Sequence, residues 1–160
     1  MIIAASVTFA GIIPGSTQET SVKQYIKTVP ANFEELFAEL QDVIINKGLV
    51  IDFIGHVDKM LTRTSSAAES ITPSGDKSPF LHAKYLQFCS SKLTHMAVSA
   101  DPQNLTICPY VFFIYETRSN PGNITLGFRP PVFGPSKRSA KIRAEVLEFL
   151  QGIVVKAISG

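Results

Sequence analysis

The side chains best suited to chemistry gather in one stretch of the sequence, from Tyr85 to Tyr110. This stretch contains both cysteines of the chain, Cys89 and Cys108, together with a histidine and a methionine. It has neither a C-x-x-C nor a C-x-x-C-H motif, so it indicates neither a thioredoxin-like pair, nor a zinc knuckle, nor covalent c-type haem attachment. Three interpretations stay open: a disulfide, two separate buried thiols, or a metal, haem or redox-active role.

The disulfide interpretation depends on how two expected strands are arranged. Cys89 ends the first of these strands and Cys108 lies near the start of the second. Antiparallel strands would bring both cysteines to one edge of the sheet, where Cα atoms within about 7 Å can be bridged. Parallel strands would place them at opposite ends. A bridge across a loop of this size contributes on the order of 3 kcal/mol of stability.

A second group of candidate ligands surrounds His56, which ends an expected strand beside a polar loop. Met60 follows four residues later, so a helix would place both side chains on one face, and a His/Met pair can ligate haem or copper. Asp52 or Asp58 could orient His56 as an acid, a base or a ligand. The plainer interpretation makes Met60 and Met96 core fillers and the other two histidines surface residues.

The remaining sequence shows no familiar catalytic template. It has no P-loop, no dinucleotide-binding glycine pattern, no G-x-S-x-G and no H-E-x-x-H. Arg129 lies among aromatic residues and prolines in "TLGFRPPVF", where it binds an anion or a partner, or else pairs as a strand-end residue. A net charge of +2 gives no nucleic-acid footprint, and the densest basic run, "SKRSAKIR", is interpreted as a solvated helix start.

Two amphipathic helices are the most clearly predicted elements. The first follows Asn32, which has capping-box spacing to Glu35, and the helix ends at Lys47 and Gly48. Six apolar residues of this segment recur at helical spacing and form one continuous face. A second helix is expected over 139–158. Its apolar stripe consists of Ile142, Val146, Phe149, Leu150, Ile153, Val154 and Ala157.

The other elements predict a sheet. Strands are expected over 20–29, 49–57, 81–89, 105–117 and 124–133, with a surface loop over 65–78, a short helix over 90–100 and a turn at "DPQN". The most apolar strand, 105–117, is expected at the centre, and a turn joins it to the next strand as a hairpin. The expected fold class is α+β: a two-layer domain with a mainly antiparallel sheet packed against two long helices, and a short helix between two strands. This single domain is expected to span residues 20–160.

The first fifteen residues carry no charged side chain. They are too short for a transmembrane helix, which needs about 20 apolar residues, and they resemble the hydrophobic region of a secretory signal peptide. An uncleaved membrane tether and a buried N-terminal strand are the alternatives. We therefore expect residues 1–19 to be a signal-like or tether segment, and the protein to be periplasmic or tethered on the periplasmic side of the membrane.

Four segments lie between Tyr25 and Pro131, which is about two thirds of the chain: "NKGLVIDFIGHV", "YLQFC", "CPYVFFIYE" and "GNITLGFRPP". In this order they resemble the bacterial family catalogued as domain of unknown function 302. His56 of the first segment matches the family's histidine, and "CPYVFFIYE" is similar to "LPLKVLVYED". Cys89 and Ser90 stand where the family commonly has Gly and Asn. The resemblance implies a two-layer domain rich in β-α-β units and often exported, and it implies no catalytic mechanism.

Together these patterns predict a non-catalytic binding or accessory module of the bacterial envelope, without a cofactor. Its expected partners are a small molecule or an envelope protein, not nucleic acid, and a homodimer is also anticipated. The expected groove involves the 65–78 loop and a set of candidate ligand-binding residues: His56, Asp58, Cys89, Ser90, Ser91 and Arg129. The alternative is a haem- or copper-binding redox protein that uses His56, Met60 and a cysteine.

Overall fold

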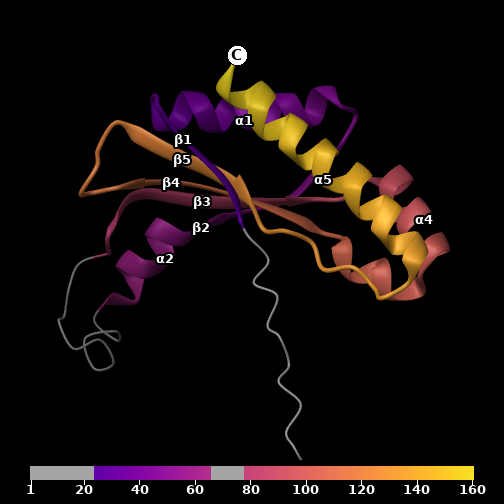
Figure 1. Cartoon of the computed structure of the whole chain (residues 1–160). Coiled ribbons are helices and arrows are strands. Elements are labelled where there is room, and N and C mark those ends of the chain that lie inside the picture. The colour runs from indigo at the N-terminus through magenta and orange to yellow at the C-terminus, as the bar shows by residue number, and fades with distance from the viewer. Residues whose placement is uncertain (1–23, 66–77) are drawn as a thin grey trace, which may run out of the picture.

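Five antiparallel strands form one sheet, with two long helices on one face and a short helix on the other (Figure 1). The computed structural model describes residues 24–65 and 78–160. Across the sheet the order is β1-β5-β4-β3-β2, with β1 (Tyr25–Pro30), β2 (Ile51–His56), β3 (Phe80–Phe88), β4 (Tyr110–Thr117) and β5 (Asn123–Phe128). The helices are α1 (Phe33–Asn46), α2 (Val57–Arg63), α4 (Ser91–Ala100), the 3-10 helix η1 (Pro102–Ile107) and α5 (Lys137–Ile158).

This architecture confirms the predicted α+β class. The strand that contains "YVFFIYET" is central, and it forms the predicted hairpin with β5. Gly122 has a φ of +78° in the hairpin turn, a conformation that glycine adopts without strain. The expected loop over 65–78 and the expected segment 1–19 lie almost entirely outside the described residues.

Helix α1 forms where the sequence predicted it, because its cap and its apolar face agree. The Asn32 side chain accepts hydrogen bonds from the backbone N–H groups of Glu34 and Glu35, at 3.0 and 3.2 Å. Such a cap contributes about 1 kcal/mol. The six apolar residues that recur at helical spacing are all buried: Phe33, Leu36, Phe37, Leu40, Val43 and Ile44.

We call the side of the sheet that α1 and α5 cover the helical face, and it contains the main core. Alternate residues of the strands point into it, and the rings of Phe88, Phe112 and Phe128 follow one another across three strands. Their centroids lie 5.5 and 5.6 Å apart. Lys84 also points to this side, where its ammonium lies over two rings of α1 and 2.8 Å from the carboxylate of Glu34.

The opposite side, the open face, is covered by α2 at one end of the sheet (Figure 1). Here two aromatic rings lie over glycines of the neighbouring strands. A side chain at Gly55 would collide with the Tyr85 ring, and one at Gly127 would collide with the Tyr25 carbonyl oxygen as well as the Phe113 ring. Glycine therefore suits both positions, because each is closely approached by a neighbouring strand.

Two strand predictions were wrong about length. Residues 105–107 belong to the 3-10 helix η1, and β4 begins only at Tyr110. The Asp101 side chain accepts a hydrogen bond from the N–H of Gln103 at 3.0 Å, and Pro102 occupies the first turn, so the helix forms there instead of a simple turn. The last strand stops at Phe128 because two prolines follow Arg129 and cannot donate to the ladder.

Candidate functional site

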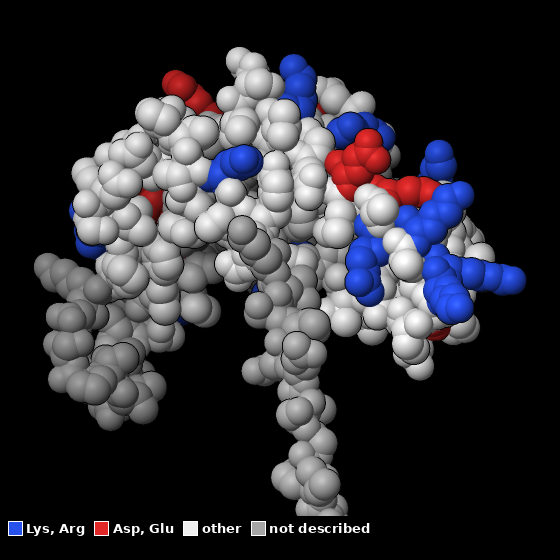
Figure 2. All heavy atoms as spheres, in the orientation of Figure 1, with Lys and Arg blue, Asp and Glu red and all other residues white. Residues whose placement is uncertain are grey.

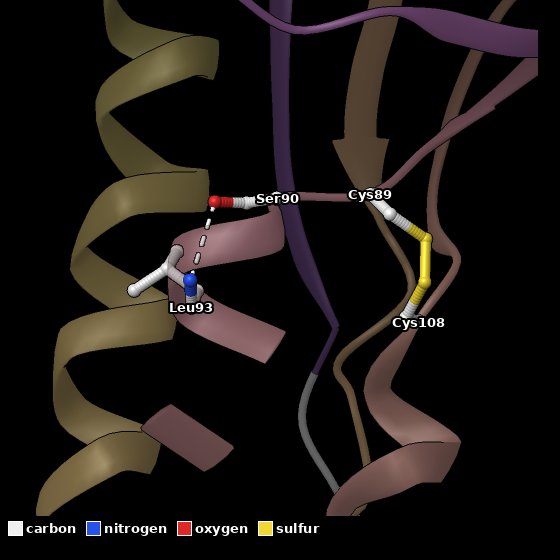
Figure 3. Close-up of a disulfide and its surroundings, with 4 residues drawn as sticks. All are labelled: Cys89, Ser90, Leu93 and Cys108. Atoms are coloured by element: carbon white, nitrogen blue, oxygen red, sulfur yellow. Dashed lines mark hydrogen bonds between the residues drawn. A yellow bond between two sulfur atoms is a disulfide. The ribbon is translucent and has the colours of Figure 1, made fainter. Parts of the chain in front are cut away.

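The disulfide between Cys89 and Cys108 closes one end of the sheet (Figure 3). Strands β3 and β4 are antiparallel, with Phe88 opposite Tyr110, so the residues that flank this pair come together. The two Cα atoms lie 5.5 Å apart. The structure therefore supports the first of the three interpretations, and neither cysteine is a free thiol.

Helix α4 begins immediately after the disulfide. The Ser90 hydroxyl accepts a hydrogen bond from the backbone N–H of Leu93 at 3.4 Å, which caps the helix (Figure 3). Ser90 is buried, whereas Ser91 and Lys92 are exposed. The chain thus passes from a cross-linked strand end directly into a capped helix. The disulfide fixes the backbone at Cys89, and the helix fixes it from Ser91 onward.

A groove of about 680 Å³ opens beside this strand-to-helix junction. Four parts of the fold meet there: the end of α1, the start of β2, the start of α4 and the middle of α5. Its apolar lining comes from Leu49, Val50, Leu93, Met96 and Phe149. The candidate residues Cys89, Ser90 and Ser91 all line this groove, and their role in binding a ligand stays a prediction.

Ionisable side chains of both signs also line the groove. Lys47 and Lys92 are basic, and Asp52 and Glu145 are acidic. The Lys47 ammonium lies 5.6 Å from the centroid of the Phe149 ring, so a cation–π contact holds it over the apolar wall. The groove is therefore lined by apolar side chains and by charged side chains of both signs.

His56 lies away from the groove. Strands β2 and β3 are antiparallel, so Ile51 pairs with Phe88 near the disulfide while His56 pairs with Lys84 toward the other end of β2. The predicted groove that combined His56 with Cys89–Ser91 does not form. A single sequence could not show this, since the separation follows from the strand register.

His56 instead precedes helix α2, together with the other candidates of that group. Asp58 lies in the first turn, where its carboxylate accepts a hydrogen bond from the N–H of Lys59 at 2.7 Å. Met60 is 43% exposed, so its interpretation as a core filler was wrong, whereas Met96 packs against the core as predicted. The use of His56 and Met60 as haem or copper ligands stays a prediction. Within the described ranges, no three His, Cys, Asp or Glu side chains group as metal ligands.

Arg129 lies at a different place, at the end of β5. It is exposed and lines two hollows of about 340 and 370 Å³, which also share Gln87 and Val111. The larger of these lies on the open face beside Tyr85 and Phe113. Arg129 is therefore separate from the groove at Cys89–Ser91, and its predicted role in binding an anion or a partner stays a prediction.

Charged residues are unevenly distributed over the molecule. Figure 2 shows Lys and Arg side chains gathered at the end of the molecule where α5 begins, with Asp and Glu side chains beside them. Four of the first seven residues of α5 are basic: Lys137, Arg138, Lys141 and Arg143. As predicted, this basic run begins a helix, and these four residues are exposed.

Comparison with known proteins identifies the fold. No family model and no curated protein matches the chain. The structure is similar to the crystal structure of an uncharacterized conserved DUF302 protein from Bacillus stearothermophilus, with a TM-score of 0.63 and 13% sequence identity. The match covers 84% of this chain and 97% of that chain. The chain therefore has a DUF302-like α+β fold, as the motifs predicted.

Sequence reasoning found the turn that lines the groove but missed most of its walls. Lys47 and Gly48 were predicted as a helix end, Phe149 as part of an apolar stripe, and Glu145 was not singled out. These residues come from segments up to about a hundred positions apart in the chain, so no local spacing pattern connects them.

No helix within residues 24–65 or 78–160 has the length and apolar character required to cross a bilayer.

Proposed function

We propose that this protein is a non-catalytic binding module of the bacterial envelope, and that it holds a small molecule in the groove beside Cys89–Ser91. One observation carries the proposal: a groove of about 680 Å³ has an apolar lining from several elements and charged groups of both signs around it. Small-molecule sites are usually concave, mostly apolar and supplied with a few polar groups that orient the ligand. The ligand is expected to have an apolar body and an ionised head group.

The disulfide supports this role because it preforms one wall of the groove. Cys89 is both a cross-linked residue and a lining residue, and the capped helix α4 starts two residues later. A wall that is already ordered lowers the entropy that a ligand must remove when it binds. The cysteines then act as a structural support of the site, and no reaction is assigned to them.

Binding is tested with two simple amphiphiles, octanoate and octylammonium, which carry head groups of opposite charge. We expect the amide NMR signals of residues 47–50 and 90–93 to shift saturably with at least one of them. Ser91→Trp, which places a large ring in the groove, should remove this response. Ser99→Trp is the matched control, since Ser99 is an exposed residue of the same helix and does not line the groove. An unchanged response in Ser91→Trp would contradict the proposed site.

The envelope location is proposed on two grounds. The first fifteen residues carry no charged side chain, which is typical of the hydrophobic region of a signal peptide. The two cysteines form a disulfide, and disulfides persist in oxidising compartments. Mass spectrometry of the protein purified from its native host should show cleavage near Gly15, or retention of the segment in a membrane fraction. It should also show the loss of about 2 Da that accompanies a disulfide. A full-length protein with reduced cysteines in the cytosolic fraction would contradict the proposal.

The alternative prediction, a redox protein with haem or copper at His56 and Met60, is separated from this proposal by one measurement. An optical spectrum with metal analysis of the natively purified protein is expected to show neither a Soret band nor stoichiometric copper. A Soret band that disappears in His56→Ala would overturn the assignment of the protein as a simple binding module.

A further inference from the structure

The two edge strands of the sheet differ in how their outer backbone edges are protected. Strand β1 contains Lys27 and Pro30, two residue types that discourage pairing with another strand. Strand β2 contains neither. In the part of the chain that the structure describes, only β3 pairs with β2, so the other side of β2 retains backbone groups without a strand partner.

Apolar side chains are exposed along the same edge. Val50 is 72% exposed, Phe53 is 51% exposed, and Ile45 of the neighbouring helix α1 is 54% exposed. These three residues line a hollow of about 510 Å³ that runs along β2. An edge that combines unpaired backbone groups with exposed apolar side chains readily adds another strand.

We propose that β2 pairs with β2 of a second copy of this chain, so that two five-stranded sheets join across a two-fold axis. Identical strands related by such an axis run antiparallel. Directly opposed side chains of two antiparallel strands point to the same face of the sheet. The two copies can therefore keep their helices on the same side of the joined sheet only if one residue of β2 lies opposite the same residue of the second copy. For the middle of β2, this residue is either Phe53 or Ile54.

Charge favours the register in which Ile54 lies opposite Ile54. This register places Asp52 opposite His56 of the second copy, twice per dimer, so that groups able to carry opposite charge face each other. It also places Phe53 opposite Gly55 of the second copy, where the ring would meet the Tyr85 ring that lies over that glycine. In the other register Asp52 would face the apolar Ile54. The irregularity of β2 lies between Ile51 and Phe53, so Asp52 has no directly paired residue on β3, whereas the residues from Phe53 to His56 are regularly paired.

The first experiment tests the register by cross-linking. Directly opposed residues in an antiparallel pair have Cα atoms roughly 4.5–5.5 Å apart, within reach of a disulfide. The native cysteines are bonded to each other, so an added cysteine is the free thiol. Ile54→Cys should form a covalent dimer under mild oxidation, visible on a non-reducing gel. Phe53→Cys tests the other register, and Thr28→Cys on β1 is the control for random cross-linking; neither should give a covalent dimer on the non-reducing gel.

The second experiment measures the mass of the full chain, 17.4 kDa as a monomer, by light scattering across a concentration series. We expect twice this mass at high concentration. Asp52→Lys and His56→Glu should each weaken the dimer about tenfold, since each introduces two unfavourable pairs. The double variant, in which the charges are exchanged, should restore it. Lys27→Glu on the opposite edge of the sheet should leave the dissociation constant unchanged.

Two results would overturn the proposal. One is a monomer mass at all concentrations, with Ile54→Cys no more cross-linked than Thr28→Cys. The other is a dimer that neither Asp52→Lys weakens nor Ile54→Cys traps, which would place the contact elsewhere. Thermal melting of each variant separates a lost contact from a lost fold. Val50 and Asp52 line both the groove and the hollow along β2, but these readouts measure association and not ligand binding, so failure of the dimer is distinguished from failure of the groove test.

Discussion

The helical face and the open face of the sheet show how unequally one set of strands can be buried. On the helical face, Leu86, Phe112 and Leu126 are fully buried beneath α1 and α5. On the open face, Ile26 and Phe53 remain 47% and 51% exposed. Both faces are rich in apolar residues, so the difference lies in how much helix covers each one. The helical face therefore provides most of the stability, whereas the open face and the β2 edge leave large apolar side chains exposed.

The sharpest test of this comparison uses two neighbouring phenylalanines of β4. Phe112 is fully buried on the helical face, whereas Phe113 is partly buried on the open face. Phe112→Ala should destabilise the protein by about 3–5 kcal/mol, because it removes a large buried ring and leaves a cavity. Phe113→Ala should cost about 1–1.5 kcal/mol, since it gives up only part of a buried side chain. Urea denaturation measures the free energy of unfolding of both variants. Equal losses would contradict the conclusion that the helical face provides most of the stability.

The disulfide gives the next largest expected effect, because it ties together the ends of two strands whose alternate residues form the helical face. Replacing both Cys89 and Cys108 by serine should lower the free energy of unfolding by about 3 kcal/mol, from the entropy that the unfolded chain regains. Thermal or urea denaturation is the measurement. A reducing agent should destabilise the native protein and leave the double variant unaffected. A native protein that is insensitive to reduction would show that the bridge does not support this end of the sheet.

Tyr110 provides a test within the helical face itself. It is 2% exposed, its hydroxyl makes no hydrogen bond within the described residues, and burial raises the pKa of Tyr110 from 10.0 to about 12. Below pH 10 both folded and unfolded states keep the proton. Between pH 10 and 12 the unfolded state loses it first, so stability should fall by about 2 kcal/mol as the pH rises.

Tyr110→Phe isolates this effect. The variant should lose less stability than the native protein between pH 10 and 12, and it should gain up to about 1 kcal/mol at neutral pH, because an unpaired buried hydroxyl is removed. Urea denaturation at several pH values measures the difference. Identical alkaline losses in the two proteins would mean that the Tyr110 hydroxyl is solvated.

The sequence predicted the secondary structure best where local signals agreed. For α1, the Asn32 cap, the six-residue apolar face and the terminal glycine all pointed to the same helix. The hairpin between β4 and β5 was predicted from a turn flanked by apolar runs, and it formed. Local signals conflicted at residues 105–107, whose apolar and β-branched side chains favoured a strand.

That conflict was decided by tertiary contacts. Asn104 is fully buried, and its side-chain amide donates hydrogen bonds to the Ala97 carbonyl and the Ser139 hydroxyl, at 2.8 and 3.0 Å. Its side-chain oxygen accepts a hydrogen bond from the N–H of Gly134 at 2.7 Å. These contacts link η1 to α4, to α5 and to the segment between β5 and α5. The spacing of residues in the sequence does not predict these contacts, because the partners lie up to 35 positions away.

By itself, the sequence determined most of the helices and strands and the core-facing sides of the two long helices, because cap residues and apolar periodicity act over only a few positions. It also limited the cysteines to three interpretations. Only the tertiary structure decided among them: the antiparallel register of β3 and β4 brings Cys89 to Cys108, and that of β2 and β3 carries His56 away from the groove. Register depends on hydrogen bonds between strands far apart in the chain, so it belongs to the folded molecule.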